Sequence, residues 1–148
     1  MAPMFSIVMP TRSRARTLRW ALQTAVNQDF EDYEIVVVDN HSTDDTAEVA
    51  RTVGGQRTRC VQPPEPLHMC KNWDFALGQA RGEYTIILSD DDGLLPNALS
   101  EAASLSDKMG VKAIQWHRVQ YNWPEYLVGG EKNCLIYYPC PGSGRGIC

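Results

Sequence analysis

The residues best suited to chemistry are three adjacent carboxylates, Asp90, Asp91 and Asp92, which follow Ser89 and the stretch 84–88, which is expected to be a buried strand. Adjacent like charges repel one another and are costly to desolvate, so a neutralising group is expected beside them. A hard cation such as Mg²⁺ or Mn²⁺ takes oxygen ligands and uses only one or two protein carboxylates, which leaves positions for phosphate oxygens and water. The cluster therefore indicates a metal-bridged phosphate.

A structural explanation of the same carboxylates is also open. Asp is favoured in turns and in the first turn of a helix, where it interacts with unpaired N–H groups and with the positive end of the helix dipole. An acidic turn before a helix would account for residues 90–92 without any ligand. The positions of the other polar groups relative to the strands favour the ligand site.

Composition limits the class of protein. The chain has 148 residues, 43% hydrophobic and 22% charged, which predicts one globular domain with its own core. The net charge of -4 argues against a nucleic-acid partner. The local basic cluster of Arg12, Arg14, Arg16 and Arg19 could meet a single phosphate group, but a solvated helix start is the favoured explanation. No apolar run approaches the ~20 residues of a membrane span and no secretory signal is visible, so the expected compartment is the cytoplasm.

Apolar runs alternate with helical patterns along most of the chain. Strands are expected at residues 5–9, 34–38, 58–62, 84–88 and 113–119. Helices are expected to begin near Thr17, after an N-cap at Ser42 or Thr43, at Met69 and at Pro96, and to end near Asn27, Gly54, Gly82 and Gly110. On the third helix, the stripe that contains Met69 and Trp73 is expected to lie in the core.

Strands and helices that alternate at this spacing form a parallel sheet with right-handed crossovers. The predicted class is α/β, with a doubly wound, mostly parallel sheet and helices on both faces. The regular pattern is expected to form one domain over residues 1–120. Residues 121–148, with one further strand at 135–138 and a tail rich in Pro and Gly, are expected to be a partial segment, so that the fold stops before it is complete.

Polar clusters follow three of the predicted strands, at residues 10–12, 39–40 and 89–92. In a doubly wound sheet the ligand crevice lies outside the carboxyl ends of the strands, so these clusters are expected to face one pocket. Asp39 is placed to accept hydrogen bonds from a ribose or a base, and Asp91 to hold a metal on a diphosphate. No Gly-x-Gly-x-x-Gly follows the first strand, which argues against a dinucleotide cofactor.

Four segments occur together and in order: Ser-Ile-Val-Met-Pro-Thr-Arg-Ser-Arg-Ala from residue 6, Glu-Ile-Val-Val-Val-Asp-Asn-His-Ser-Thr-Asp-Asp-Thr from 34, Ala-Arg-Gly-Glu-Tyr from 80, and Leu-Ser-Asp-Asp-Asp-Gly-Leu-Leu-Pro from 88. This combination resembles the family 2 glycosyltransferases over about residues 5–99. The resemblance implies a Rossmann-like GT-A fold. It also implies transfer of a sugar from a nucleotide diphosphate, usually uridine diphosphate, with inversion at the anomeric carbon.

The resemblance implies positions for the nucleotide. It puts Pro10, Thr11 and Arg12 beside the nucleotide and makes Asp39 the acid that meets the base. His68 lies where some members of the family have a basic residue near the base, although a histidine at a helix start also has a structural explanation.

The family's Asp-x-Asp signature falls on Ser89, Asp90 and Asp91. By resemblance Asp91 is the ligand of Mn²⁺ or Mg²⁺ and Asp90 lies near the ribose. Ser89 replaces the first acid, which weakens one metal or ribose contact. The cation would stabilise the departing diphosphate while a carboxylate takes the proton of the attacking hydroxyl. Only Glu125 and Glu131 follow in the segment where the family has this base, and neither is assigned to it.

The implied partners are a nucleotide diphosphate sugar and a sugar, lipid or other hydroxyl acceptor, with membrane association only through the acceptor. One alternative is a catalytically inactive fragment that binds nucleotide sugars. Another is a phosphatase of the haloacid dehalogenase type, because its Asp-x-Asp-Gly string fits residues 90–93. Its motif normally ends the first strand and precedes a Lys and a second acidic pair, which disfavours it here.

Overall fold

The computed structural model describes residues 2–115, 119–121 and 135–137. The chain divides into two compact units, Met1–Gly110 and Val111–Cys148. The domain boundary predicted between residues 120 and 121 stays a prediction. Among the described residues, no helix has the length and apolar character that crossing a membrane requires.

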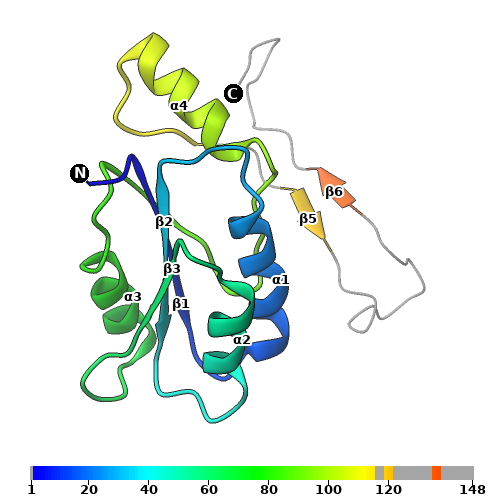
Figure 1. Ribbon diagram of the computed structural model, residues 1–148, viewed down its shortest axis with the longest axis vertical. Helices are drawn as coiled ribbons and strands as arrows, with labels where there is room; N and C mark the ends of the chain where they lie inside the picture. Colours follow the sequence, from blue (N-terminus) through cyan, green and yellow to red (C-terminus); the bar gives the residue numbers. More distant parts are fainter. Residues whose placement is uncertain (1, 116–118, 122–134, 138–148) are drawn as a thin grey trace. The chain divides into compact units, whose positions relative to one another are not determined.

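A four-stranded sheet forms the centre of the first unit, and every neighbouring pair of strands in it is parallel. The strands are β1 (Phe5–Thr11), β2 (Tyr33–Asp39), β3 (Thr58–Val61) and β4 (Tyr84–Ile87), in the order β3-β2-β1-β4. The helices are α1 (Ala15–Val26), α2 (Thr46–Val53), α3 (Met69–Leu77) and α4 (Ala98–Met109) (Figure 1). The chain therefore moves outward from β1 to β3 and then returns to the other side of β1.

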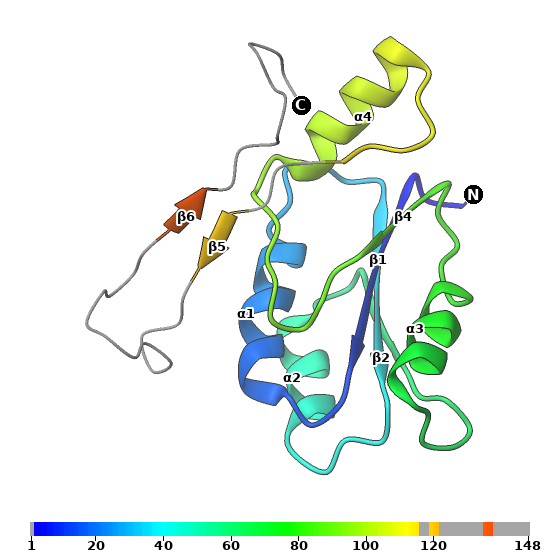
Figure 2. The ribbon, with the colours of Figure 1, turned by 180° about the vertical axis from the view of Figure 1, so that it is seen from behind.

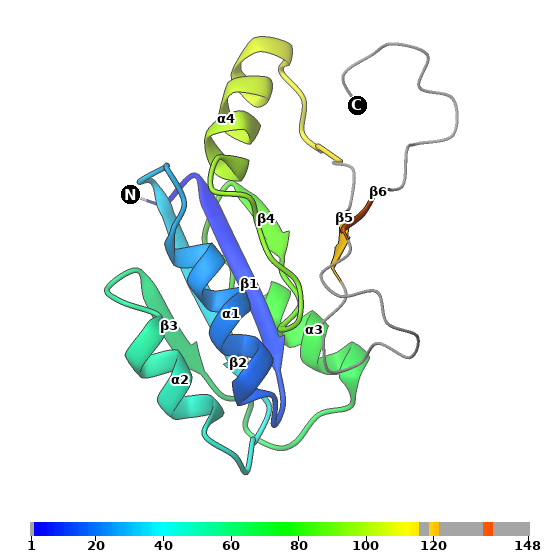
Figure 3. The same cartoon turned by 90° about the vertical axis from the view of Figure 1, so that its right-hand side faces the viewer.

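Helices cover both faces of this sheet. α1 and α2 lie on one face and α3 lies on the other (Figures 1 and 3). After β4, at the sheet edge beside β1, the chain runs back along α1 to α4 (Figure 2). The Tyr84 hydroxyl lies 2.6 Å from the Ser106 hydroxyl, which fixes α4 beside the start of β4. The predicted doubly wound α/β class is confirmed.

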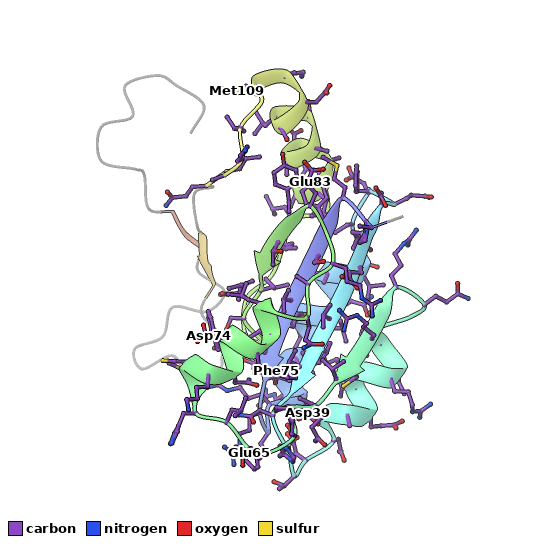
Figure 4. All side chains as sticks on the ribbon, turned by 90° about the vertical axis from the view of Figure 1, so that its left-hand side faces the viewer. Asp39, Glu65, Asp74, Phe75, Glu83 and Met109 are labelled. Atoms are coloured by element: carbon purple, nitrogen blue, oxygen red, sulfur yellow. The ribbon has the colours of Figure 1, made fainter. Side chains whose placement is uncertain are left out.

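The inner strands are apolar along their whole length because both of their faces are covered. All seven residues of β1 are buried, and the four β-branched residues of β2 from Ile35 are fully buried. On the α3 side, Val8, Val36 and Val38 pack with Ala76, and Phe75 packs against this group (Figure 4). The core therefore holds β1 and β2 in place, and this fixes where the residues at the ends of these two strands lie.

A polar network joins the strands at their amino ends. The buried Ser6 hydroxyl donates to Glu34 Oε1 at 2.8 Å and accepts from the Gly82 N–H at 2.8 Å. Glu34 also accepts from Arg59 Nε at 3.1 Å, and these contacts hold its pKa below the ordinary value despite partial burial. Gly82 thus lies against β1, whereas α3 ends at Leu77, so the prediction that Gly82 ends this helix is wrong.

The predicted core stripe on α3, which ran from Met69 and Trp73 to Ala76 and beyond, is wrong for the first two residues and confirmed for Ala76. Met69 is 72% exposed and Trp73 is 38% exposed, whereas Asn72 and Ala76 are buried. The apolar residues of this helix are spread over two faces, so their spacing alone did not identify the inner one. The small side chain of Ala76 lets the helix approach the valines of the sheet.

Three further predictions need correction. Neither Ser42 nor Thr43 caps α2, which begins at Thr46 after Asp45. β4 is a half-exposed edge strand and not a buried one, because no described strand covers its outer side. Residues 113–115 of the strand expected at 113–119 are not in a strand.

In the second unit, β5 (Val119–Tyr121) pairs with β6 (Leu135–Tyr137) in an antiparallel sheet of two strands. A strand at 135–138 was expected, and its first three residues form β6.

The Gly82→Ala substitution tests the packing at the amino end of the sheet. A Cβ atom at residue 82 would lie 2.6 Å from the Ser6 backbone nitrogen, so we expect a loss of roughly 2 kcal/mol in unfolding free energy. Urea unfolding followed by circular dichroism measures it. Gly78→Ala is the control, since its Cβ would meet nothing closer than 3.4 Å and its backbone is αR. Equal losses in the two variants would contradict this account.

Candidate functional site

The carboxyl ends of β1, β2 and β4 meet at one corner of the sheet. Thr11 is the register partner of Asp39, and the Thr11 hydroxyl donates to Asp90 Oδ2 at 2.7 Å. Asp39 lies at the opposite end of the sheet from Glu83 (Figure 4). The strand order reverses between β1 and β4, and such a reversal is where doubly wound sheets place their ligand crevice.

A cavity of about 360 Å³ opens at this corner. Its described lining consists of Pro10, Thr11, Arg12, Arg14, Asn40, Leu67, His68, Met69, Asn72, Trp73, Ser89, Asp90 and Asp91. The cavity therefore joins residues from all three predicted clusters to the start of α3. Asp39 is not in this lining, although its neighbours Thr11 and Asn40 are.

The two carboxylates in the lining have different surroundings. The Asp90 side chain is 10% exposed, and burial raises its pKa, while the Thr11 hydrogen bond and the Arg14 charge act in the opposite direction. The Asp91 side chain is 46% exposed and accepts from the Ser89 hydroxyl at 2.6 Å. Asp90 thus anchors the corner to β1, and Asp91 offers its oxygens to the cavity.

Arg14 lies against both carboxylates. Its Nη1 is 3.2 Å from Asp91 Oδ2, and its Nε is 3.9 Å from Asp90 Oδ1. The sequence favours a solvated helix start for Arg14 and gives no sign of its contact with Asp90 and Asp91. Its contact with Asp91, 77 positions away, depends on the topology, which brings the start of α1 beside the end of β4. No local pattern could have identified this contact.

The oxygen donors of this corner fit a divalent cation that is shared with a phosphate ligand. No three His, Cys, Asp or Glu side chains of the described residues are grouped so that they could hold a metal by themselves. Mg²⁺ and Mn²⁺ need only one or two protein carboxylates when a diphosphate supplies further oxygens. Asp91 is a carboxylate of this kind, and the Ser89 hydroxyl beside it is a further oxygen group.

Asn40 attaches the segment before α3 to the end of β2. Its Nδ2 donates to the Leu67 carbonyl, and its Oδ1 accepts from the Leu67 N–H, both at 2.8 Å. This pair of bonds places His68, the residue before α3, on the cavity wall. Asp39 is 5% exposed, and its Oδ1 accepts from the Ser42 N–H at 2.9 Å, so this carboxylate also orders the turn after β2.

Asp44 holds the loop after β1 against the loop after β2. It accepts from the Ala15 N–H at 3.0 Å, in the first turn of α1, and from the Thr46 N–H at 3.1 Å, at the start of α2. The Ser42 hydroxyl accepts from the Ser13 N–H at 2.7 Å. Ser13 has a φ of 50°, a left-handed conformation that these contacts maintain. The backbone beside Arg14 is therefore fixed by residues of the second loop.

Asn72 is the second cavity residue that the sequence did not indicate. It is 4% exposed, and among the described residues its Oδ1 is the one buried side-chain nitrogen or oxygen atom without a hydrogen-bond partner. A buried polar atom without a partner is uncommon in folded proteins and is often found at functional sites. The incorrect assignment of the inner face of α3 concealed it.

The comparisons with known proteins agree with this geometry. The chain matches the model of Glycosyl transferase family 2 over residues 6–139. It belongs to this family. The GalNAc(5)-diNAcBac-PP-undecaprenol beta-1,3-glucosyltransferase of Campylobacter jejuni is 37% identical over 106 residues, which cover 66% of this chain and 33% of that enzyme. The poly(ribitol-phosphate) beta-N-acetylglucosaminyltransferase TarS of Staphylococcus aureus is 29% identical and covers 70% of this chain.

Solved structures of family members have the same fold. Residues 1–349 of S. aureus TarS in complex with UDP match with a TM-score of 0.67 and 28% identity, over 72% of this chain and 32% of that one. The mannosyltransferase PcManGT from Pyrobaculum calidifontis, in complex with GDP-Man and Mn²⁺, matches with a TM-score of 0.63 and 25% identity, over 72% and 33%. These neighbours confirm the GT-A fold implied by the sequence. The chain spans about a third of the Campylobacter enzyme and of these two solved chains, and 19% of the full TarS sequence.

Two asparagines of the cavity wall should respond oppositely to replacement by leucine. Asn72→Leu removes an unpaired buried oxygen, so we expect the unfolding free energy to rise by roughly 1 kcal/mol. Asn40→Leu leaves both backbone groups of Leu67 unpaired, so we expect a loss of about 2 kcal/mol. Chemical unfolding of each variant measures both changes, and a destabilised Asn72→Leu protein would show that the amide is satisfied in solution.

Proposed function

We propose that this chain binds a nucleotide diphosphate sugar through its uridine diphosphate part. The sugar is then transferred to a hydroxyl acceptor. The observation that carries the proposal is the Thr11–Asp90 hydrogen bond, which joins the ends of β1 and β4 under a cavity with Asp91 on its wall. Membership of Glycosyl transferase family 2 supports the same reaction class. The similar TarS structures contain UDP and UDP-GlcNAc, which supports the choice of nucleotide.

The predicted nucleotide residues keep their roles in this proposal. Pro10, Thr11 and Arg12 lie along one side of the nucleotide, and His68 lies at the cavity wall near the base. Asp39 meets the base from the end of β2. One of its oxygens already accepts from Ser42, so the other is the one proposed for the ligand.

Asp91 is the proposed protein ligand of Mn²⁺ or Mg²⁺. The Mn²⁺ complex of the similar mannosyltransferase supports a divalent ion without deciding which one. When bound, the ion supplies positive charge to the diphosphate that leaves. Asp90 keeps its predicted place near the ribose, and its hydrogen bond from Thr11 also keeps Asp91 at the cavity.

The reaction is proposed to be a direct displacement that inverts the anomeric carbon. A carboxylate must accept the proton of the acceptor hydroxyl, and the two candidates named from the sequence, Glu125 and Glu131, lie outside the described residues. The proposed acceptor is a sugar, a lipid or another hydroxyl compound. The name of the Campylobacter relative includes undecaprenol, which supports a lipid-linked acceptor. We retain the cytoplasm as the proposed compartment.

The alternative of an inactive binding fragment predicts the same donor affinity without transfer. The haloacid dehalogenase alternative gains no support. Asp90, which would be its nucleophile, is largely buried and already accepts a hydrogen bond from Thr11. The family match over residues 6–139 also assigns the acidic cluster to a glycosyltransferase sequence.

Calorimetric titration with uridine diphosphate tests the proposed donor site. We expect binding to the unmodified chain to require Mn²⁺ or Mg²⁺ and to weaken at least tenfold in Asp91→Ala, because the metal loses its proposed protein ligand. Asp107→Ala is the matched control, since Asp107 is exposed on α4. Metal-independent binding, or equal affinity in both variants, would contradict the proposed metal site.

A further inference from the structure

Arg14 already places a cation where the proposed metal would bind. Its Nη1 contacts Asp91 Oδ2 at 3.2 Å, and the other oxygen of Asp91 accepts from Ser89. Its Nε faces Asp90 at 3.9 Å. The guanidinium is thus the positive group beside two carboxylates whose charges repel each other.

This ion pair is too exposed to be an anchor of the fold. The Arg14 side chain is 53% exposed and that of Asp91 is 46% exposed. Exposed pairs of this kind contribute little to stability because water and salt screen them. The buried Thr11–Asp90 hydrogen bond performs the structural task nearby. Arg14 can therefore leave the acidic corner at small cost.

The backbone of Arg14, by contrast, is held in place. Its N–H donates to the Thr46 hydroxyl at 3.3 Å, and the next N–H, of Ala15, donates to Asp44 at 3.0 Å. Any change in the position of the Arg14 side chain therefore starts from a backbone that is fixed at the start of α1. Because Arg14 lines the same cavity as Asp91, a diphosphate bound there lies within the region that this side chain can reach.

We propose that Arg14 is a displaceable counter-cation, which neutralises Asp91 before the donor binds and moves to the diphosphate when a divalent ion takes its place. The proposal rests on the proposed function. A metal ion on Asp91 competes for the oxygen that Arg14 holds and repels the guanidinium. A diphosphate then offers oxygens to Arg14, and arginine pairs strongly with such groups through two parallel hydrogen bonds. Arg14 thereby becomes a donor-binding residue.

The proposal predicts effects of opposite sign in Arg14→Gln. Without nucleotide, Mn²⁺ should bind roughly threefold more tightly, because its competitor for Asp91 is gone. With saturating Mn²⁺, uridine diphosphate should bind about tenfold more weakly, because a charge-assisted contact is lost. A residue with a merely structural role would weaken both equilibria or neither.

The experiment uses the full chain and measures binding without a turnover assay. Free Mn²⁺ is quantified by electron paramagnetic resonance in the absence of nucleotide, and uridine diphosphate and uridine are titrated by calorimetry with Mn²⁺ present. Arg14→Lys retains the charge without the planar fork, so Mn²⁺ affinity should stay near that of the unmodified chain while diphosphate affinity is intermediate. Arg19→Gln is the control, since Arg19 is exposed on α1. Uridine affinity should not change in any variant.

The outcomes separate this inference from the proposed function. If the unmodified chain binds uridine diphosphate with Mn²⁺ but Arg14→Gln leaves both equilibria unchanged, only the role of Arg14 is overturned. Weaker Mn²⁺ binding in Arg14→Gln also overturns it, because the side chain would then support the metal site. If the unmodified chain binds no uridine diphosphate at all, both proposals fail. Thermal unfolding of Arg14→Gln near that of the Arg19→Gln control shows that the fold is intact.

Discussion

The buried hydrogen bond from the Thr11 hydroxyl to Asp90 is the contact on which the site depends. It joins residues 79 positions apart, and it gives a largely buried carboxylate the partner that its burial requires. Without it, the segment after β4 would carry three carboxylates away from the end of β1. With it, the next residue, Asp91, is held at the wall of the cavity.

Chain topology brings these two residues together. β1 lies in the middle of the sheet, with β2 on one side and β4 on the other. The register pairs Thr11 with Asp39, so the carboxyl ends of the first two strands lie level with each other. Because these strands are parallel, the loops that follow β1, β2 and β4 lie at the same end of the sheet. The amino ends, closed by Ser6 and Glu34, serve stability instead.

The sequence predicted the strands well because β1 and β2 are apolar at almost every position, which suits only a strand covered on both faces. The same physics predicted the convergence of Thr11, Asn40 and Asp91. It failed for part of α3, whose apolar residues lie on two faces of the helix. The face that contains Met69 was predicted to be buried, and Met69 is exposed. It also missed the contact of Arg14 with Asp91, because these two residues are distant in the sequence.

Family membership and physical reasoning contribute different parts of the account. The family model establishes the family, and the solved relatives establish the fold. They do not explain why a serine stands at the first position of the acidic signature. In this structure the Ser89 hydroxyl donates to Asp91, so the replacement orients the remaining carboxylate and removes one negative charge from the corner.

Asp44 connects the loops that follow β1 and β2, at the end of the sheet where the proposed donor binds. Because one carboxylate binds the first turn of α1 and the start of α2, the loops after β1 and β2 have little freedom to move independently. The start of α1, from which the Arg14 side chain extends, is therefore already ordered by contacts within the protein. Binding of the proposed nucleotide would then cost little backbone entropy in these two loops, and the ordering penalty would fall mainly on side chains such as that of Arg14.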